Sequence, residues 1–285
     1  MIGRIPVIGI LAARYHETFY KVDYSVYEWL KASGALVIYI DPRLSRKEII
    51  RIFNSLDGIV IPGGAEYPFR DILTYESSKL IFQLAEIHGN FPVLGICMGL
   101  QFMLTYYSGG DWDAVKTVVC NYGYSSKTSI VNPLEGTFLS SVPIQLIDGN
   151  LAFNHKNAIL LKTFEKYPKL GDTFELLTTS QHKDWQFVSS IQGKKYPIFG
   201  VQWHPEKPKY EWSEKQNIIR NDNAIKIGKC VGDFFVQYCR GTKNKTPLKI
   251  FMDYNLNKLK LTSHRYLRVD DESYYDEPLI KYILE

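Results

Sequence analysis

The first two hundred residues alternate between short apolar runs rich in β-branched residues and longer amphipathic stretches of helical period. The apolar runs predict buried strands over residues 6–11, 35–40, 58–61 and 92–96. The stretches between them predict helices over residues 23–33, 46–55 and 75–88. This alternation indicates βαβ crossovers and a parallel sheet covered on both faces. Ligands of such sheets bind at the carboxyl ends of the strands, so we expect the chemistry in the loops after Ile61 and Ile96.

The second half of the chain changes pattern. Residues 117–197 are richer in Thr, Val, Ser and Phe, and predict antiparallel strands over 127–131, 174–180 and 187–191. A parallel-type strand is expected over 196–203 and a long helix over 223–240. We therefore predict one α/β domain over residues 1–285, with a mostly parallel central sheet plus antiparallel additions. Residues 241–285, basic at first and acidic at the end, are expected to pack on it as a C-terminal extension.

Composition excludes several classes of protein. The 285 residues are 45% apolar and 22% charged, which excludes disorder as the main state. The net charge of +4 is mild, so no nucleic-acid partner is expected. The longest nearly apolar stretch, residues 91–104, contains Pro92, Gly95 and Gly99 and is too short to span a bilayer, so no membrane partner is expected either. The four cysteines form no CxxC pair and have no zinc-ligand spacing, and nothing calls for a metal or an organic cofactor.

The strongest local signal is the segment Gly-Ile-Cys-Met-Gly at residues 95–99, between a predicted strand and a predicted helix over 100–107. Its glycines leave room for a sharp turn that holds the sulfur of Cys97 at the end of the strand. The helix N-terminus behind the turn favours the thiolate over the thiol. The alternative is a buried structural cysteine. The segment predicts a nucleophile elbow with Cys in place of Ser.

A second signal closes the predicted strand at 196–203. Pro205 biases His204 toward an extended conformation, and residues two apart on an extended segment point the same way. Glu206 can therefore reach the imidazole of His204 and orient it. A base held by a carboxylate beside a thiol is the arrangement of a Cys-His-Glu triad. Taken alone, His-Pro-Glu fits a polar strand end equally well; paired with the elbow, it predicts a triad.

A third signal is the pair Gly63 and Gly64, directly after the predicted strand at 58–61. Successive glycines at the carboxyl end of a strand expose backbone N–H groups. The N–H of Gly64, with that of Met98 as the second donor, can stabilise a developing oxyanion. Alone, the loop would be read as an ordinary turn.

Together, in this order, the Pro-Gly-Gly loop, the Gly-x-Cys-x-Gly elbow and the His-Pro-Glu segment resemble the class I glutamine amidotransferase superfamily. The resemblance implies a flavodoxin-like, three-layer α/β fold and hydrolysis of γ-glutamyl amides through a thioester. It implies that Cys97 is the nucleophile, that His204 is the general acid/base, and that Glu206 orients it. It also implies an oxyanion hole at Gly64 and Met98.

A closer resemblance lies in Tyr-Pro-Ile-Phe-Gly-Val-Gln-Trp-His-Pro-Glu-Lys, residues 196–207, which continues to Tyr-Glu-Trp at 210–212. This segment is similar to the γ-glutamyl hydrolase branch, which trims poly-γ-glutamate from folates. The strand at 6–11, the Phe-Asn-His-Lys at 153–156 and the last long helix also match. The resemblance implies that His155 positions the substrate or polarises the leaving group.

Substrate-binding residues follow from the chemistry of such a substrate. Poly-γ-glutamate carries one free α-carboxylate per residue, so we expect basic side chains near the cleft to bind these carboxylates. Arg70 and Lys156 lie near the relevant loops in the sequence, and Gly63 lies at the cleft. The branch usually has Tyr-Ile-Ala-Ala-Ser-Tyr at its first helix, where this chain has Lys-Val-Asp-Tyr-Ser-Val. Either Tyr20 or Tyr24 substitutes for the missing tyrosine, or a substrate contact differs.

Two other functions remain open at this level. One is a glutaminase subunit that donates ammonia to a synthetase, and the other is a non-catalytic binding protein on the same scaffold. The resemblance allows a homodimer. It implies a lysosomal, vacuolar or extracellular location, although the chain starts in its first strand without a signal segment; a cytoplasmic location is expected if the chain is complete as given.

Overall fold

A computed structural model describes residues 4–15, 19–64, 68–117, 126–211, 217–242, 244, 246–264 and 279–284. The described strands include a central eight-stranded sheet in the order β4-β1-β5-β6-β12-β11-β10-β8. The strands from β4 to β12 run parallel, and the last three are antiparallel additions. The predicted fold class is therefore confirmed. The strands of this sheet are β1 (Val7–Leu11), β4 (Leu36–Ile40), β5 (Gly58–Ile61), β6 (Val93–Ile96), β8 (Lys127–Ile130), β10 (Phe174–His182), β11 (Trp185–Gly193) and β12 (Ile198–Val201).

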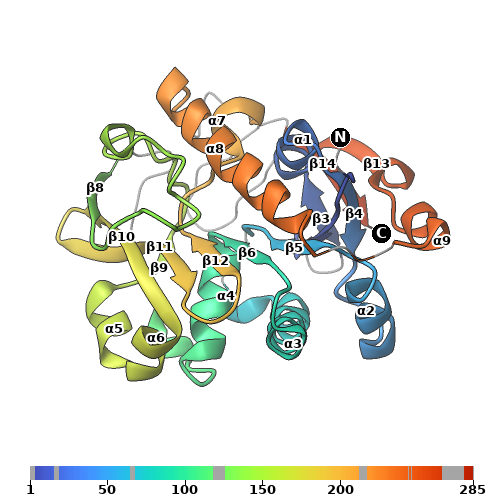
Figure 1. The fold of residues 1–285 in the computed structure, drawn as a ribbon, viewed down its shortest axis with the longest axis horizontal. Coiled ribbons are helices and arrows are strands. Elements are labelled where there is room, and N and C mark those ends of the chain that lie inside the picture. Colours follow the sequence, from blue (N-terminus) through green and yellow to red (C-terminus); the bar gives the residue numbers. More distant parts are fainter. Residues whose placement is uncertain are drawn as a thin grey trace.

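Helices cover both faces of the sheet, which gives three layers (Figure 1). One face carries α1 (Tyr24–Ala32), α7 (Lys207–Tyr210) and α8 (Asp222–Cys239), which contact one another. The other face carries α2 (Arg46–Phe53), α3 (Ile72–His88), α4 (Met98–Tyr107), α5 (Leu161–Lys166) and α6 (Pro168–Thr173).

Alternation along the strands divides the apolar residues between two cores. In β5, Val60 belongs to the core shared with α1 and α8, whereas Ile59 and Ile61 belong to the core shared with α2, α3 and α4. Phe235 and Phe53, almost fully buried, lie in the first and second core respectively. Burial of such a side chain stabilises the fold by roughly 1.5–3 kcal/mol. The sheet is therefore a rigid platform, and the loops at the carboxyl ends of β5, β6 and β12 are held by it.

Two smaller sheets flank the central one. β7 (Val115–Thr117) pairs with β9 (Asn157–Ile159), and a four-stranded sheet has the order β13-β14-β3-β2. Its strands are β2 (Ala13–Arg14), β3 (Tyr20–Asp23), β13 (Lys260–His264) and β14 (Leu279–Leu284). Because β14 pairs with β3, the C-terminal region completes a sheet begun near the N-terminus.

The described part of the C-terminal region also contacts the edge of the central sheet. The hydroxyl of Tyr254, just after α9 (Leu248–Asp253), donates to Glu48 Oε1 at 2.6 Å. The backbone N–H of Tyr39 in β4 donates to the carbonyl of Tyr254 at 3.0 Å. These contacts join the region after residue 241 to the body of the protein; the assignment of residues 1–285 to one domain stays a prediction.

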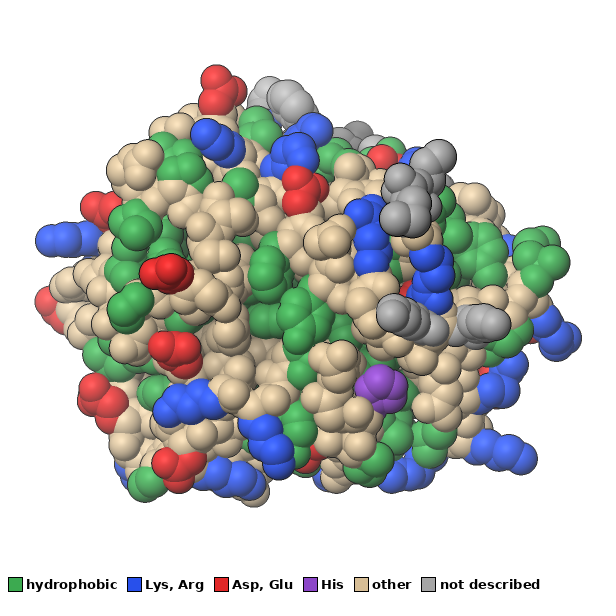
Figure 2. Space-filling model, in the orientation of Figure 1, with side chains coloured by type: hydrophobic (Ala, Val, Ile, Leu, Met, Phe, Trp, Pro, Cys, Tyr) green, Lys and Arg blue, Asp and Glu red, His purple; other side chains and the backbone are tan. Residues whose placement is uncertain are grey.

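The molecular surface carries both charge signs. Figure 2 shows Lys and Arg side chains interspersed with Asp and Glu side chains over the face in view. None of the helices that the structure describes has the length and apolar character needed to cross a bilayer. Cys97, Cys230 and Cys239 are free thiols, and of these Cys97 and Cys239 are buried. Cys120 lies outside the described residues.

Candidate active site

Cys97 occupies a strained turn between β6 and α4. Its backbone angles, φ of 53° and ψ of −104°, lie outside the regions that residues other than glycine normally adopt. The glycines on either side allow the turn because the backbone approaches them closely. A Cβ on Gly99 would lie 2.1 Å from the carbonyl oxygen of Ile61, and one on Gly95 would lie 2.8 Å from the carbonyl carbon of Gly99. The chain thus forms the elbow that the Gly-x-Cys-x-Gly spacing predicts.

The elbow is tied to β12 by hydrogen bonds. The backbone N–H of Cys97 donates to the carbonyl of Val201 at 2.7 Å, so this N–H is not free to bind a ligand. The thiol is 5% exposed, and its Sγ lies 3.5 Å from Gln202 Nε2 and 4.0 Å from the carbonyl oxygen of Asn154. The nucleophile is therefore enclosed by the loop after β12 and the segment before β9.

His204 lies in the loop after β12 and is held from two sides. Its Nδ1 lies 2.7 Å from Glu206 Oε1, and its backbone N–H donates to the carbonyl of Ala152 at 2.8 Å. Both side chains of the pair are almost fully buried. Burial alone would lower the pKa of His204, but the charges of Glu206 and then Cys97 outweigh it and raise that pKa to about 10. The arrangement therefore favours an imidazolium beside the sulfur at neutral pH.

The glycine loop after β5 faces the side chains of Cys97 and His204. A Cβ placed on Gly63 would lie 2.8 Å from His204 Cε1 and 3.4 Å from Cys97 Cβ. A Cβ placed on Gly64 would lie 2.3 Å from Met98 Cε, at the flexible end of that side chain. Met98 is the first residue of α4, where a backbone N–H has no acceptor within the helix. The glycine loop, the elbow and His204 thus converge on one place; an oxyanion hole at Gly64 and Met98 stays a prediction.

His155 lies beside this group as a neutral base. Its side chain is 4% exposed, its Nδ1 is 3.1 Å from the carbonyl oxygen of Asn157, and its ring packs edge-on against Phe153 and Phe187. Burial, and then the neighbouring His204, lower the pKa of His155 to about 3. Because the carbonyl oxygen of Asn157 can only accept a hydrogen bond, the proton of the neutral imidazole lies on Nδ1. Nε2 is then an acceptor. A neutral imidazole suits a role in holding a substrate N–H or a water molecule.

The remaining predicted binding residues lie in different surroundings. Tyr20 is a buried core residue of β3, and the guanidinium of Arg43 lies 5.4 Å from its ring centre. Arg70 is exposed on a 3-10 turn, with its guanidinium over the ring of Phe69. Lys156 is half-buried, next to His155. The contacts described for these three do not include Cys97 or His204, so their roles stay predictions.

Two pairs of residues in this region were missed by the sequence interpretation. Gln101 Nε2 lies 3.2 Å from Gln202 Oε1, within the core beside Cys97. Lys207, the first residue of α7, forms a buried ion pair with Glu211, one turn further along the chain. The available signal was position: both glutamines lie within the two segments that carry the catalytic residues, and the Lys–Glu pair has the i, i+4 spacing of helical partners.

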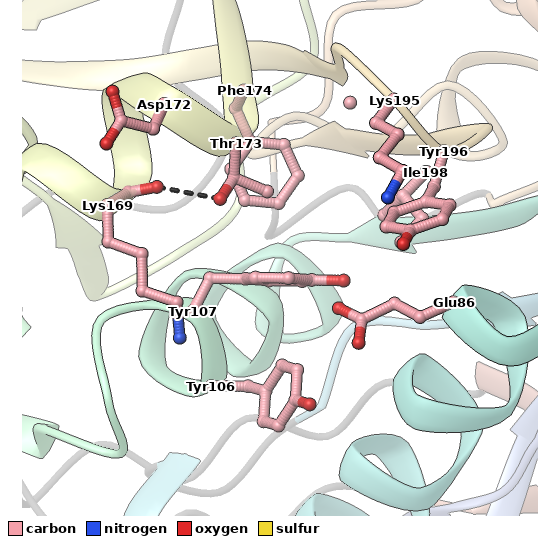
Figure 3. A pocket seen from close by; sticks show the side chains of 11 residues that line it. Glu86, Tyr106, Tyr107, Lys169, Asp172, Thr173, Phe174, Lys195, Tyr196 and Ile198 are labelled. Atoms are coloured by element: carbon pink, nitrogen blue, oxygen red, sulfur yellow. Dashed lines mark hydrogen bonds between the residues drawn. The ribbon is translucent and has the colours of Figure 1, made fainter.

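A cavity of about 340 Å³ lies away from the catalytic residues, by the amino end of β12 (Figure 3). It is lined by Glu86 of α3, Tyr106 and Tyr107 of α4, residues 169 and 172–174, and Gly193, Lys195, Tyr196 and Ile198. Cys97 and His204 follow the carboxyl ends of β6 and β12, so this cavity lies at the opposite end of β12 from them. Among the described residues, no group of three or more His, Cys, Asp or Glu side chains is arranged to hold a metal ion.

Comparisons with known proteins show the family of this chain. A family model described as "Glutamine amidotransferase class-I" matches residues 18–222. Gamma-glutamyl hydrolase of Mus musculus is 31% identical over 256 residues, which cover 82% of this chain and 78% of that protein. Gamma-glutamyl hydrolase of Bos taurus is 29% identical, over 82% of this chain and 78% of that protein. Gamma-glutamyl hydrolase B of Dictyostelium discoideum is 29% identical, over 86% and 75%.

A solved structure shows the same fold. It is described as a putative GMP synthase protein from Thermoplasma acidophilum, with a TM-score of 0.58 and 20% sequence identity. The match covers 84% of this chain and 96% of that one. The chain belongs to the class I glutamine amidotransferase family, and within it to the γ-glutamyl hydrolases.

Proposed function

We propose that this enzyme hydrolyses the γ-glutamyl bonds of poly-γ-glutamates, including folyl poly-γ-glutamates, through a thioester on Cys97. The observation that carries the proposal is the arrangement of Cys97 beside His204, with the imidazole held by Glu206 at 2.7 Å. Hydrolysis of γ-glutamyl bonds is the activity named for the relatives in mouse, cattle and Dictyostelium. The thioester and the polyglutamate substrate are the proposal's own additions.

In the acylation step, the Cys97 thiolate attacks the γ-carbonyl carbon and a C–S bond forms. The carbonyl oxygen becomes an oxyanion, which accepts hydrogen bonds from the N–H groups of Gly64 and Met98. When the tetrahedral intermediate collapses, the C–N bond breaks. The His204 imidazolium gives its proton to the leaving amine, which is the amino group of the next glutamate.

In the deacylation step, water attacks the thioester carbonyl and gives a proton to His204, now neutral. The C–S bond breaks, the glutamyl carboxyl group leaves and loses the second proton of the water to solvent, and Cys97 is again a thiolate beside an imidazolium. Glu206 stabilises the charged imidazole at both ends of this cycle. His155, neutral and close to His204, supports a role in holding the leaving amine or the water.

The α-carboxylates of the substrate require cations at the mouth of the site. Lys156, half-buried and directly after His155 in the chain, is one candidate. Arg70 is exposed, and its guanidinium can bind a carboxylate through two parallel hydrogen bonds. By resemblance we also propose a lysosomal, vacuolar or extracellular location for the enzyme, and a homodimer as its assembly.

The test is a product assay on the purified chain. Wild-type protein, Cys97→Ala and a control variant, Cys230→Ala on α8, are incubated with an aminobenzoate that bears several γ-linked glutamates, and separately with glutamine. Chromatography that shows shortened chains with the wild type and with Cys230→Ala, and none with Cys97→Ala, supports the proposal. Cleavage of glutamine with no shortening would favour a glutaminase subunit instead. No cleavage of either substrate would favour a non-catalytic binding protein.

A further inference from the structure

The side chain of Gln202 meets the sulfur of the nucleophile. Its Nε2 lies 3.5 Å from Cys97 Sγ, within the range of an N–H···S hydrogen bond. Gln202 is fully buried, on the first residue after β12, so its amide has no water with which to exchange partners. A buried amide must form hydrogen bonds through both its N–H₂ group and its carbonyl oxygen. Its orientation is therefore determined by which neighbours donate and which accept.

Gln101 settles that orientation. Its Nε2 donates to the backbone carbonyl of Asn157 at 2.6 Å, and a carbonyl can only accept, so this atom must be the nitrogen. The same N–H₂ group donates to Gln202 Oε1 at 3.2 Å. With its oxygen taken by Gln101, Gln202 turns its own N–H₂ toward the sulfur. A flipped Gln202 would place nitrogen against nitrogen on one side and oxygen against sulfur on the other.

The two histidines near the sulfur differ from the Gln202 amide because they titrate. His204, paired with Glu206, faces Cys97 from the loop after β12 and supplies a proton and a charge. His155 comes from the segment before β9, lies near His204 and is neutral. The amino end of α4 contributes its dipole. Each histidine gains or loses a proton with pH, whereas an amide keeps its donor at every pH.

We propose that Gln202 belongs to the catalytic group of this enzyme: its amide, locked by Gln101 and the carbonyl of Asn157, donates a hydrogen bond to Cys97 Sγ. The hydrogen bond stabilises the thiolate over the thiol and fixes the direction in which the sulfur points. When the sulfur forms the thioester and loses its charge, the bond weakens, and it strengthens again as the thiolate leaves. The effect of this hydrogen bond on catalysis rests on the proposed function. The hydrogen bond itself does not depend on it.

The test compares Gln202→Met and Gln202→Glu with the wild type and with Gln186→Met and Gln186→Glu. Gln186 is an exposed glutamine on β11, so its variants make the same chemical changes away from the site. Methionine keeps the length of the side chain but donates no hydrogen bond. Glutamate keeps an oxygen that can accept from Gln101, so the packing of that amide survives even where methionine fails to fold. The circular dichroism spectrum checks the fold of each variant.

The primary readout is the rate at which iodoacetamide alkylates Cys97, followed by mass spectrometry of the peptide that contains it between about pH 5 and pH 9. Loss of a hydrogen bond to a charged group corresponds to about a tenfold lower rate at neutral pH. We expect that loss in both Gln202 variants, with the midpoint of the pH profile moved to higher pH, and no change in either Gln186 variant. Steady-state assays are expected to show a lower kcat with KM nearly unchanged.

Folded Gln202 variants that alkylate within about twofold of the wild type at each pH would overturn the inference. A role in packing alone would lower the unfolding midpoint without moving the alkylation profile, and would overturn it as well. Because iodoacetamide reacts without any substrate, this outcome is distinguishable from a failure of the proposed function, which the product assay reports.

Discussion

Lys207 and Glu211 form a buried ion pair that begins directly after Glu206 in the chain. Each residue is 7% exposed, and Ser25 Oγ donates a further hydrogen bond to Glu211 Oε2 at 3.4 Å. Burial alone would lower the pKa of Lys207, but Glu211, then Glu206 and Asp23, raise it. Lys207 is therefore a buried cation directly after Glu206 in the chain. This gives the Glu-Lys-x-x-Tyr-Glu spacing a physical reason, because the charge of Glu206 has a neighbour of opposite sign.

Lys207→Met tests the contribution of this pair to stability. Removal of one partner leaves a buried, uncompensated carboxylate, so we expect a loss of roughly 3–5 kcal/mol in the free energy of unfolding. The matched control is Lys229→Met, which breaks the i, i+4 pair with Asp233 on the exposed face of α8 and is expected to cost less than about 1 kcal/mol. Urea denaturation measures both. Equal losses in the two variants would contradict the burial argument.

Gly63→Ala tests how closely the glycine loop approaches the base. The added Cβ would lie 2.8 Å from His204 Cε1, so the imidazole or the loop must shift. We expect kcat to fall by about a hundredfold, since a displacement of this size misaligns the reacting groups. Gly171→Ala in α6 is the control, because nothing lies within 4 Å of its Cβ. An unchanged kcat in Gly63→Ala would show that the loop does not pack on His204 as described.

Glu206→Gln tests the carboxylate that orients His204. The substitution keeps the shape of the side chain but removes its charge, so the pKa of His204 should fall. We expect kcat to drop by roughly 10²–10⁴-fold, while the imidazole, followed by NMR, loses its proton at lower pH than in the wild type. Glu165→Gln on α5 serves as a neutral comparison. A titration midpoint of His204 that does not move would exclude Glu206 as the main source of its charge.

The two histidines predict opposite effects of pH on stability. The folded pKa of His204 is raised to about 10, so its contribution is complete below about pH 6.5 and is lost as the pH rises toward 10. The folded pKa of His155 is lowered to about 3, so the unfolded chain binds the extra proton between about pH 6.5 and 3, and stability falls as the pH falls through that range.

Unfolding by urea at a series of pH values checks this account. His155→Gln is expected to remove from the acid side a slope of up to about 1.4 kcal/mol per pH unit. The alkaline side should keep its slope in that variant, because His204 is still present. An acid limb with the same slope in the variant and the wild type would show that His155 is not buried in its neutral form.

Local chemistry made much of the site predictable. His204 and Glu206 are two residues apart, and the elbow residues are contiguous, so each arrangement depends on the backbone over a few residues. The alternation of strands and helices placed these segments at the same edge of a parallel sheet, which the structure bears out. The pairing of Gln101 with Gln202 joins positions that are 101 residues apart, and its geometry depends on how α4 packs against the loop after β12.

Element ends were less predictable, because tertiary contacts override local signals there. Ser45 caps α2 by accepting from the N–H of Glu48 at 3.3 Å. The carboxylate of Glu48, however, pairs with Arg51 and accepts from Tyr254, a residue from the far end of the chain. The third helix starts at Ile72 rather than at residue 75, because Asp71 caps it and its exposed first residues carry no burial pattern. The strand expected over 196–203 is only Ile198–Val201, and His204 lies in the loop that follows it.

The measurement that tests the central claim most directly is the detection of the acyl-enzyme. Wild-type protein is mixed with a γ-linked oligoglutamate and quenched in acid within the first turnovers, and the intact mass and the peptide that contains Cys97 are then determined. We expect a hydroxylamine-labile adduct with the mass of the acyl group on Cys97, and no adduct in Cys97→Ala. Substrate turnover with no adduct on Cys97, or with the adduct on another residue, would contradict the account.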